Sequence, residues 1–270
     1  MKIAVAQNNY HIGNFNHNIE KILAAIRKAR SAKADLIIFS ELAVCGYPPR
    51  DFLEFDDFIQ RCENAIRLIA AETKDIAVIV GSPSRNPQVE GKDLFNSAFY
   101  LADGQVKDVV HKALLPTYDV FDEYRYFEPA REFHVVRCKN LKLAVTVCED
   151  IWNVGNDNPL YTLCPMDELI NENPDVLINI SASPFDYTQT ENRLRVLRAN
   201  AARYRLPVFY VNHVGAQTEL IFDGGSIVMN AAGKVVDELP YFEECYREYD
   251  LEAVIASASG QQEDRLAQSY

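Results

Sequence analysis

The chain has 270 residues, 48% of them hydrophobic and 24% charged, which is a globular composition and enough length for one large α/β domain. Its 39 Asp and Glu outnumber its 27 Lys and Arg, and the net charge of −12 argues against a nucleic-acid partner or an anionic membrane surface. The N-terminal MKIAVAQN has too few apolar residues for a secretion signal, and no apolar run approaches membrane-spanning length. We therefore expect a cytoplasmic protein that binds neither nucleic acid nor membrane.

The cysteines are spaced too widely to suggest a metal site. No CxxC pair or other tight spacing occurs, so the sequence indicates neither a zinc site nor a small disulfide framework. We expect most of them to be reduced core residues and no metal to be bound. The six are Cys45, Cys62, Cys138, Cys148, Cys164 and Cys245.

The first half of the chain opens with a β-α-β pattern. Lys2–Asn8 and Asp35–Phe39 are rich in apolar and β-branched residues and predict two buried strands. Apolar residues recur at helical spacing across Asn16–Lys33, so the two strands are expected to lie parallel in one sheet. The same patterns then predict a helix over Asp56–Thr73, a strand over Ile76–Gly81, and a hairpin of Leu94–Leu101 with Gln105–His111.

A long irregular segment, Lys112–Ala130, separates the two halves, and its dense aromatic residues argue for an ordered, functional loop. Arg193 and Arg203 are expected on the polar face of a helix in the second half. The elements predicted there are strands at Phe133–Arg137 and Leu141–Val147, a helix at Leu160–Asn173, a strand at Asp175–Ile180, a helix at Thr190–Tyr204, a strand at Pro207–Asn212, a hairpin across Gly224–Leu239, and an edge strand at Tyr246–Asp250.

Two β-α-β halves with hairpins between them predict a two-sheet α/β sandwich with helices outside. No glycine-rich fingerprint follows the first strand and no GxxxxGK loop occurs, which argues against nucleotide binding by this chain. Residues 1–255 are interpreted as one domain. The pattern fades over residues 256–270, which are interpreted as a tail or linker.

Three polar residues follow buried strands at the point where irregular chain begins: Glu41, Lys112 and Cys148. The carboxyl ends of parallel strands are where α/β sheets build their sites. Cys148, in LAVTVCEDIW, is followed directly by Glu149 and Asp150, which would disfavour its thiolate, so a nucleophilic role requires a nearby cation. Lys112 can supply that cation and Glu41 a general base.

Two of these residues also have a simpler interpretation. Free cysteine is among the most buried residue types, so Cys148 alone could be plain core. Glu41 could be a charge at a helix start or on the surface. A Cys-His pair would need a histidine in a comparable position, and only His111, beside Lys112, is so placed.

The motifs SELAVCGY, HKALLPTYDVFDEYRYF and VTVCEDIW resemble, in order and over essentially the whole chain, the three catalytic signatures of the nitrilase or carbon-nitrogen hydrolase superfamily. The resemblance implies a nitrilase-like four-layer α-β-β-α sandwich. It makes Glu41 the general base, Lys112 the lysine that stabilises the oxyanion, and Cys148 the nucleophile. Glu123 would be the second glutamate, which holds the lysine and the substrate; otherwise it is a loop carboxylate paired with Arg125.

Within the superfamily, GYPPRD, CEDIW and LPTYDVFDE look like the glutaminase domain of glutamine-dependent NAD synthetases. That resemblance implies L-glutamine as substrate, in a pocket lined by Tyr118, Glu149 and Ser183. It also implies that ammonia passes to a C-terminal synthetase domain, which amidates deamido-NAD with ATP and Mg. Members of this family are often homo-oligomers, so the same is expected here.

Two features depart from that family. Gln189 stands where many members carry a basic residue for the glutamine carboxylate, and Arg193, one helical turn on, is the expected substitute. No SGGxDS loop is present, so we expect a missing synthetase half, with ATP and Mg required only there and no cofactor in this chain. The alternatives are a stand-alone amidase acting on another small amide, and a degenerate domain kept for oligomer contacts.

Overall fold

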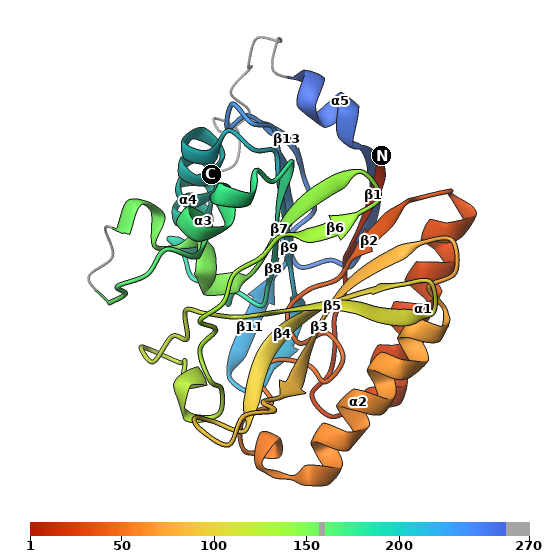
Figure 1. Cartoon of the computed structure of the whole chain (residues 1–270), viewed down its shortest axis with the longest axis vertical. Coiled ribbons are helices and arrows are strands. Elements are labelled where there is room, and N and C mark those ends of the chain that lie inside the picture. The colour runs from red at the N-terminus through yellow and green to blue at the C-terminus, as the bar shows by residue number, and fades with distance from the viewer. Residues whose placement is uncertain (157–159, 258–270) are drawn as a thin grey trace.

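Two six-stranded sheets lie face to face between two layers of helices in the computed structural model, which describes residues 1–156 and 160–257 (Figure 1). The side chains of Asn156 and Gln189 also lie outside that description. Figure 1 shows α1 and α2 against the first sheet and α3 and α4 against the second. The helices are α1 (Phe15–Ser31), α2 (Asp56–Ala71), α3 (Pro165–Leu169), α4 (Gln189–Tyr204) and α5 (Leu251–Ala256).

The first sheet has the strand order β14-β1-β2-β3-β4-β5. The strands β1, β2 and β3 run parallel, as the β-α-β pattern predicts, and β4, β5 and β14 are antiparallel to their neighbours. The strands are β1 (Lys2–Gln7), β2 (Leu36–Ile38), β3 (Ala77–Arg85), β4 (Leu94–Ala102), β5 (Gln105–His111) and β14 (Cys245–Asp250).

The second sheet has the order β13-β12-β9-β8-β7-β6, with β7, β8 and β9 parallel, and β10 and β11 form a separate hairpin. Both sheets therefore have a parallel centre whose strands end at one edge. The strands are β6 (Val136–Cys138), β7 (Leu141–Val147), β8 (Val176–Ser181), β9 (Val208–Asn212), β10 (Val214–Gln217), β11 (Leu220–Asp223), β12 (Ile227–Met229) and β13 (Val235–Glu238).

The two-residue period of the strands sorts their apolar side chains into three buried layers. In β1, Ile3 and Val5 pack between the sheets, whereas Ala4 and Ala6 face α1 and α2. A third cluster joins α3 and α4 to the second sheet. The predicted four-layer α-β-β-α sandwich is confirmed.

Some predicted elements were wrong. The helix expected over Leu160–Asn173 is only α3 and one 3-10 turn, because Pro165 has no N–H to continue a helix before it and Asn173 ends the segment in the left-handed region (φ 55°). The hairpin of β10 and β11 and helix α5 were missed. Most of the expected tail, residues 258–270, lies outside the described part. Within the described ranges, no helix has the length and hydropathy needed to cross a membrane.

Candidate active site

The ends of three strands place the three predicted residues in the interior. Glu41 lies just beyond β2, Lys112 follows β5 and Cys148 follows β7. Their exposed fractions are 1%, 0% and 7%, so Glu41 is not a surface charge. Cys148 is buried, but it also lines a hollow of about 420 Å³, which a residue of plain core would not do.

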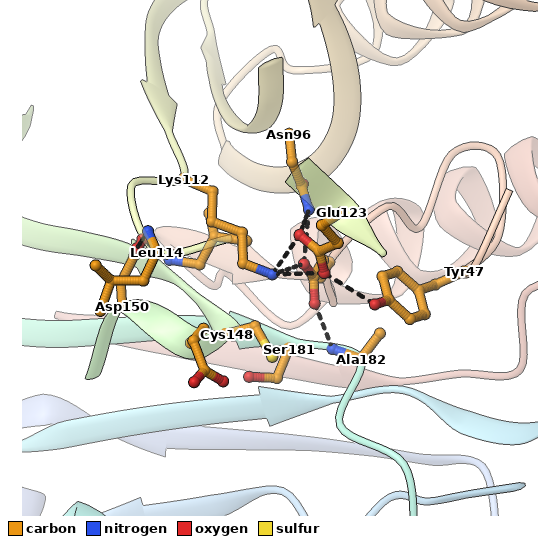
Figure 2. Close-up of polar contacts among 12 residues, drawn as sticks. Tyr47, Asn96, Lys112, Leu114, Glu123, Cys148, Asp150, Ser181 and Ala182 are labelled. Atoms are coloured by element: carbon orange, nitrogen blue, oxygen red, sulfur yellow. Dashed lines mark hydrogen bonds and ion pairs between the residues drawn. The ribbon is translucent and has the colours of Figure 1, made fainter. Parts of the chain in front are cut away.

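The Lys112 ammonium lies between two carboxylates (Figure 2). Its Nζ is 2.8 Å from Oε1 of Glu41 and 2.8 Å from each carboxylate oxygen of Glu123. Burial lowers the pKa of Lys112, but the charges of Glu123 and Glu41 outweigh that effect and hold the pKa well above its usual range. Lys112 is therefore a fixed cation inside the protein.

The Glu41 carboxylate is held by neutral donors as well as by Lys112. Asn96 donates from Nδ2 to Oε1 at 2.7 Å, and the backbone N–H of Ala182 donates to Oε2 at 2.9 Å. The chain after β2 runs so close to β3 that a Cβ on Gly81 would lie 2.3 Å from the backbone nitrogen of Leu42. Glycine at 81 is thus required for Glu41 to reach this position.

Glu123 comes from the irregular segment after β5. The Tyr47 hydroxyl donates to its Oε1 at 2.8 Å, and burial raises the pKa of Glu123 to about 7 against the lowering effect of Lys112. Pairing with Arg125, the alternative from the sequence, does not occur, because Arg125 lies outside and pairs with Asp51 and Glu54.

Cys148 occupies a strained backbone position. Its φ is +44°, in the left-handed region that non-glycine residues rarely adopt, and it opens the short 3-10 helix Cys148–Ile151. Burial raises the pKa of its thiol well above the usual range, the Glu41 charge raises it further, and Lys112 offsets this only in part. The resting group is therefore a thiol, which needs a base to take its proton when it attacks.

Asp150 ties the chain after Lys112 to the chain around Cys148. Its Oδ1 accepts from the backbone N–H groups of Ala113 and Leu114, both at 2.9 Å, and its Oδ2 accepts from the N–H of Val147 at 3.0 Å. Burial raises the pKa of Asp150 to about 6, while these donors act against the rise. One carboxylate thus fixes the cation and the nucleophile relative to each other.

We expect Asp150→Asn to lower the free energy of unfolding by about 1–3 kcal/mol. The asparagine NH₂ would replace the oxygen that accepts from the N–H of Val147, so two donors would face each other and that N–H would lose its acceptor. Urea denaturation measures the change. Asp175→Asn is the matched control, since Asp175 accepts from the N–H of Lys142 at the exposed opposite end of β7 and should cost less than about 0.5 kcal/mol. Equal losses in the two variants would show that Asp150 has no special role.

The predicted substrate-binding residues Tyr118, Glu149 and Ser183 line the hollow together with Cys148. The Tyr118 hydroxyl donates to Oε1 of Glu149 at 2.9 Å, and that of Tyr161 donates at 2.8 Å. Burial raises the pKa of Glu149, and these two hydroxyls oppose the rise. Three further carboxylates line the hollow, and none of its described lining residues is Lys or Arg; the three are Asp119, Asp186 and Glu219.

Two expectations about arginine were wrong. Arg193 is 1% exposed, so it does not lie on a polar face of α4, and it pairs with Asp223 at 2.9 Å rather than facing the hollow. It is therefore not a substitute for a basic residue at position 189. The side chain of Gln189 lies outside the described part of the chain, so its expected contact with substrate stays a prediction.

The Cys-His alternative finds no support. His111 and Lys112 are consecutive residues of an extended chain, so their side chains point to opposite faces of the sheet. The His111 ring stacks on Phe95, with the ring centroids 4.1 Å apart. It lines a different hollow from Cys148. Among the residues that the structure describes, no cluster of His, Cys, Asp and Glu could hold a metal ion.

The structure adds contacts that the sequence did not predict. Tyr47 and Asn96 hold the two glutamates, Asp150 holds the backbone, and Tyr161 shares Glu149 with Tyr118. Tyr47 lies inside the GYPPRD motif and Asp150 inside CEDIW, so both motifs carried a signal. Asn96 had none, because it is followed by Ser97 in a mainly apolar strand and nothing in the sequence distinguishes the two.

Comparison with known proteins places this site in a family. The family model described as carbon-nitrogen hydrolase matches residues 2–258. The glutamine-dependent NAD(+) synthetase of Synechocystis sp. is 40% identical over 257 residues, covering 92% of this chain and 46% of that protein. The corresponding protein of Thermotoga maritima is 35% identical over 252 residues, covering 93% and 42%. The chain thus spans less than half the length of these relatives.

Solved structures agree. A glutamine-dependent NAD+ synthetase from Acinetobacter baumannii in complex with ADP superposes with a TM-score of 0.84 at 34% identity, covering 97% of this chain and 48% of that one. An amidase from Nesterenkonia sp. AN1 superposes with a TM-score of 0.78 at 23% identity, covering 96% of each chain. The second likeness shows a common fold only.

Proposed function

Because the chain belongs to the carbon-nitrogen hydrolase family, we propose that it hydrolyses the side-chain amide of L-glutamine through a thioester on Cys148. The observation that carries the proposal is the buried Lys112 ammonium, held between Glu41 and Glu123, because the charges of Lys112 and Glu41 act on the thiol of Cys148, which lines the hollow. A nucleophile, a base and a fixed cation that lie close together are what acyl transfer requires.

In the first half of the reaction, Cys148 Sγ bonds to the amide carbon while Glu41 takes the thiol proton. The negative charge moves to the amide oxygen, where Lys112 and a backbone N–H near residue 149 stabilise it. The intermediate collapses when the C–N bond breaks, and Glu41 returns the proton to the departing nitrogen. Ammonia leaves, and a glutamyl thioester remains on Cys148.

In the second half, water takes the place that ammonia has left. Glu41 removes a proton from the water as its oxygen bonds to the thioester carbon, and the same cation stabilises the second oxyanion. The C–S bond then breaks, the sulfur regains a proton through Glu41, and glutamate is released. The net reaction consumes one water and one glutamine and yields one ammonia and one glutamate.

The lining of the hollow supports a substrate that carries an ammonium group. Its carboxylates, with Glu149 nearest the nucleophile in sequence, complement the α-ammonium of glutamine. The named relatives are glutamine-dependent enzymes, which supports glutamine over other amides of this kind. We assign substrate contacts to Tyr118, Glu123, Glu149 and Ser183.

We also propose that the chain acts as the ammonia-supplying part of a glutamine-dependent NAD(+) synthetase. In that reaction a C-terminal domain would use ATP and Mg to amidate deamido-NAD, whereas the hydrolytic part would need no cofactor. The relatives named above support this, since they are about twice as long as the matched region. A homo-oligomer, as the resemblance implies, in the cytoplasm, as expected from the sequence pattern, completes the proposal.

The deciding test is intact mass after exposure to a glutamine-mimicking diazoketone, with excess glutamine as competitor. We expect one adduct, located on Cys148 by peptide mapping and suppressed by glutamine. Cys148→Ala provides the control and should gain no adduct.

Two outcomes would contradict the proposal. A thiol that reacts with general alkylators but ignores the diazoketone would instead support an amidase for another small amide. A folded protein whose Cys148 reacts with neither reagent would support a degenerate domain kept for its contacts.

A further inference from the structure

A buried ion pair lies behind the wall of the hollow. Arg193, on α4, is 1% exposed, and Asp223, the last residue of β11, is 0% exposed. The two join through Nη2 to Oδ1 at 2.9 Å and Nη1 to Oδ2 at 3.1 Å, and Nη1 also donates to the carbonyl of Gly224 at 3.3 Å. Removing two charges from water costs about as much free energy as their attraction returns, so a buried ion pair adds little net stability. The pair therefore points to a role other than stability.

Asn212, the last residue of β9, connects this pair to the hollow. Its Nδ2 donates to Oδ1 of Asp223 at 3.2 Å, to the carbonyl of Gly224 at 2.9 Å and to the carbonyl of Ser183 at 3.3 Å. Its Oδ1 accepts from the backbone N–H of Ser183 at 2.9 Å. One side chain therefore holds both backbone polar groups of Ser183, and the ion pair fixes the orientation of that side chain.

These contacts position residues that line the hollow, where the substrate is taken to bind, rather than the thiol of Cys148. Ser183 lines the hollow, and so do Glu219, Leu220 and Ile221 of the hairpin that Asp223 ends. The preceding residue, Ala182, is fixed separately through its N–H to Glu41. The network thus sets the distance between two walls of the hollow, while a different set of bonds positions the catalytic charges.

We propose that Arg193, Asp223 and Asn212 are positioning residues. They hold the Ser183 segment and the β10–β11 hairpin in the positions from which these contact the substrate. The proposal rests on the proposed function, because the substrate is taken to enter this hollow. The buried charges keep this wall in place: without them Asn212 would lose its charged acceptor, Asp223, and would be held through its Nδ2 by backbone carbonyls alone, so Ser183 could shift relative to Cys148.

The test compares a double variant of the buried ion pair with a single variant of an exposed ion pair. Arg193→Met/Asp223→Asn removes both charges together, leaves no charge unpaired and keeps an acceptor for Asn212. Arg203→Met is the control, because Arg203 also lies on α4 and pairs with Asp167 through three hydrogen bonds, but these partners are 46% and 37% exposed and neither lines the hollow. Readouts are KM and kcat for glutamine, and the rate at which iodoacetamide, a small neutral reagent, alkylates Cys148.

We expect the double variant to raise KM for glutamine about tenfold, with kcat and the alkylation rate within about threefold of the unmodified chain. Arg193→Lys, which keeps both charges but loses the two-pronged geometry of the pair, should raise KM by less than the double variant does. Arg203→Met should leave all three quantities within about twofold. Peptide hydrogen exchange should quicken across residues 182–185 in the double variant only, since Asn212, which accepts from the Ser183 N–H, is then held less firmly.

An unchanged KM and unchanged exchange in a folded double variant would overturn the proposal. So would a parallel fall of kcat and alkylation rate, because the network would then act on the thiol. If the double variant does not fold, Arg193→Lys carries the same comparison, and a KM unchanged in it would count against the proposal. Failure of the unmodified chain to hydrolyse glutamine would instead refute the proposed function, and the exchange across residues 182–185 would still report on the positioning role.

Discussion

Cys148→Ala is expected to reduce glutamine hydrolysis at least about 10⁴-fold, because Cys148 forms the thioester on which both halves of the proposed reaction depend. The protein should remain folded, since alanine fills the same site and meets the same backbone requirement at a φ of +44°. Glutamate release at saturating glutamine measures the loss, and thermal unfolding checks the fold.

Cys164→Ala is the matched control for this experiment. Cys164 is also 7% exposed, but it packs against α4 and bonds to the Tyr204 hydroxyl rather than lining the hollow. Its replacement should leave hydrolysis within about twofold. Turnover retained in Cys148→Ala, or lost equally in both variants, would contradict the assignment of the nucleophile.

Lys112→Met is expected to lower hydrolysis at least about 10³-fold, because it removes the charge that stabilises both oxyanions. The variant should also lose about 3–5 kcal/mol of stability, since the two glutamates are then buried without a counter-charge. Adding Glu123→Gln removes one of those charges. The double variant should regain most of the stability and none of the activity, a combination that separates the structural role of Lys112 from its chemical one.

The stability of Lys112→Met should depend on pH in a definite direction. Burial already raises the pKa of Glu123 to about 7 against the effect of Lys112, so loss of the lysine raises it further, whereas the unfolded value is about 4.3. A group with a raised folded pKa contributes stability below its unfolded pKa and loses it as pH rises through the folded value. Urea denaturation should therefore show a fall from about pH 5 to above pH 7, which should be smaller in the double variant because Glu123 no longer titrates there. A pH-independent loss would contradict the charge assignment.

The sequence predicted the three strand ends because runs of apolar residues break abruptly there. A buried strand must end where polar residues begin, so Glu41, Lys112 and Cys148 could be placed at one edge of a sandwich without coordinates. That they lie close together followed from resemblance, because no local pattern says which strand of one sheet faces which strand of the other.

The missed features share a physical cause: each depends on a partner distant in sequence. Arg193 seemed to lie on a polar helix face because its counter-charge, Asp223, ends a hairpin that the sequence did not reveal. That hairpin turns at Thr218 and Glu219, with Thr218 at a φ of +53°, a position where glycine or asparagine would have signalled the turn. The left-handed backbone at Cys148 is likewise imposed by its surroundings and has no signal in residue type.

The pairing of β14 with β1 has a consequence for how the chain forms during synthesis. Lys2 pairs with Asp250, and the N–H of Leu251 donates to the carbonyl of Met1 at 2.9 Å. While β1, β2 and β3 can associate early, β1 remains an open sheet edge until almost 250 further residues have left the ribosome. The nascent chain must therefore keep its first strand from pairing with other molecules until β14 has been made.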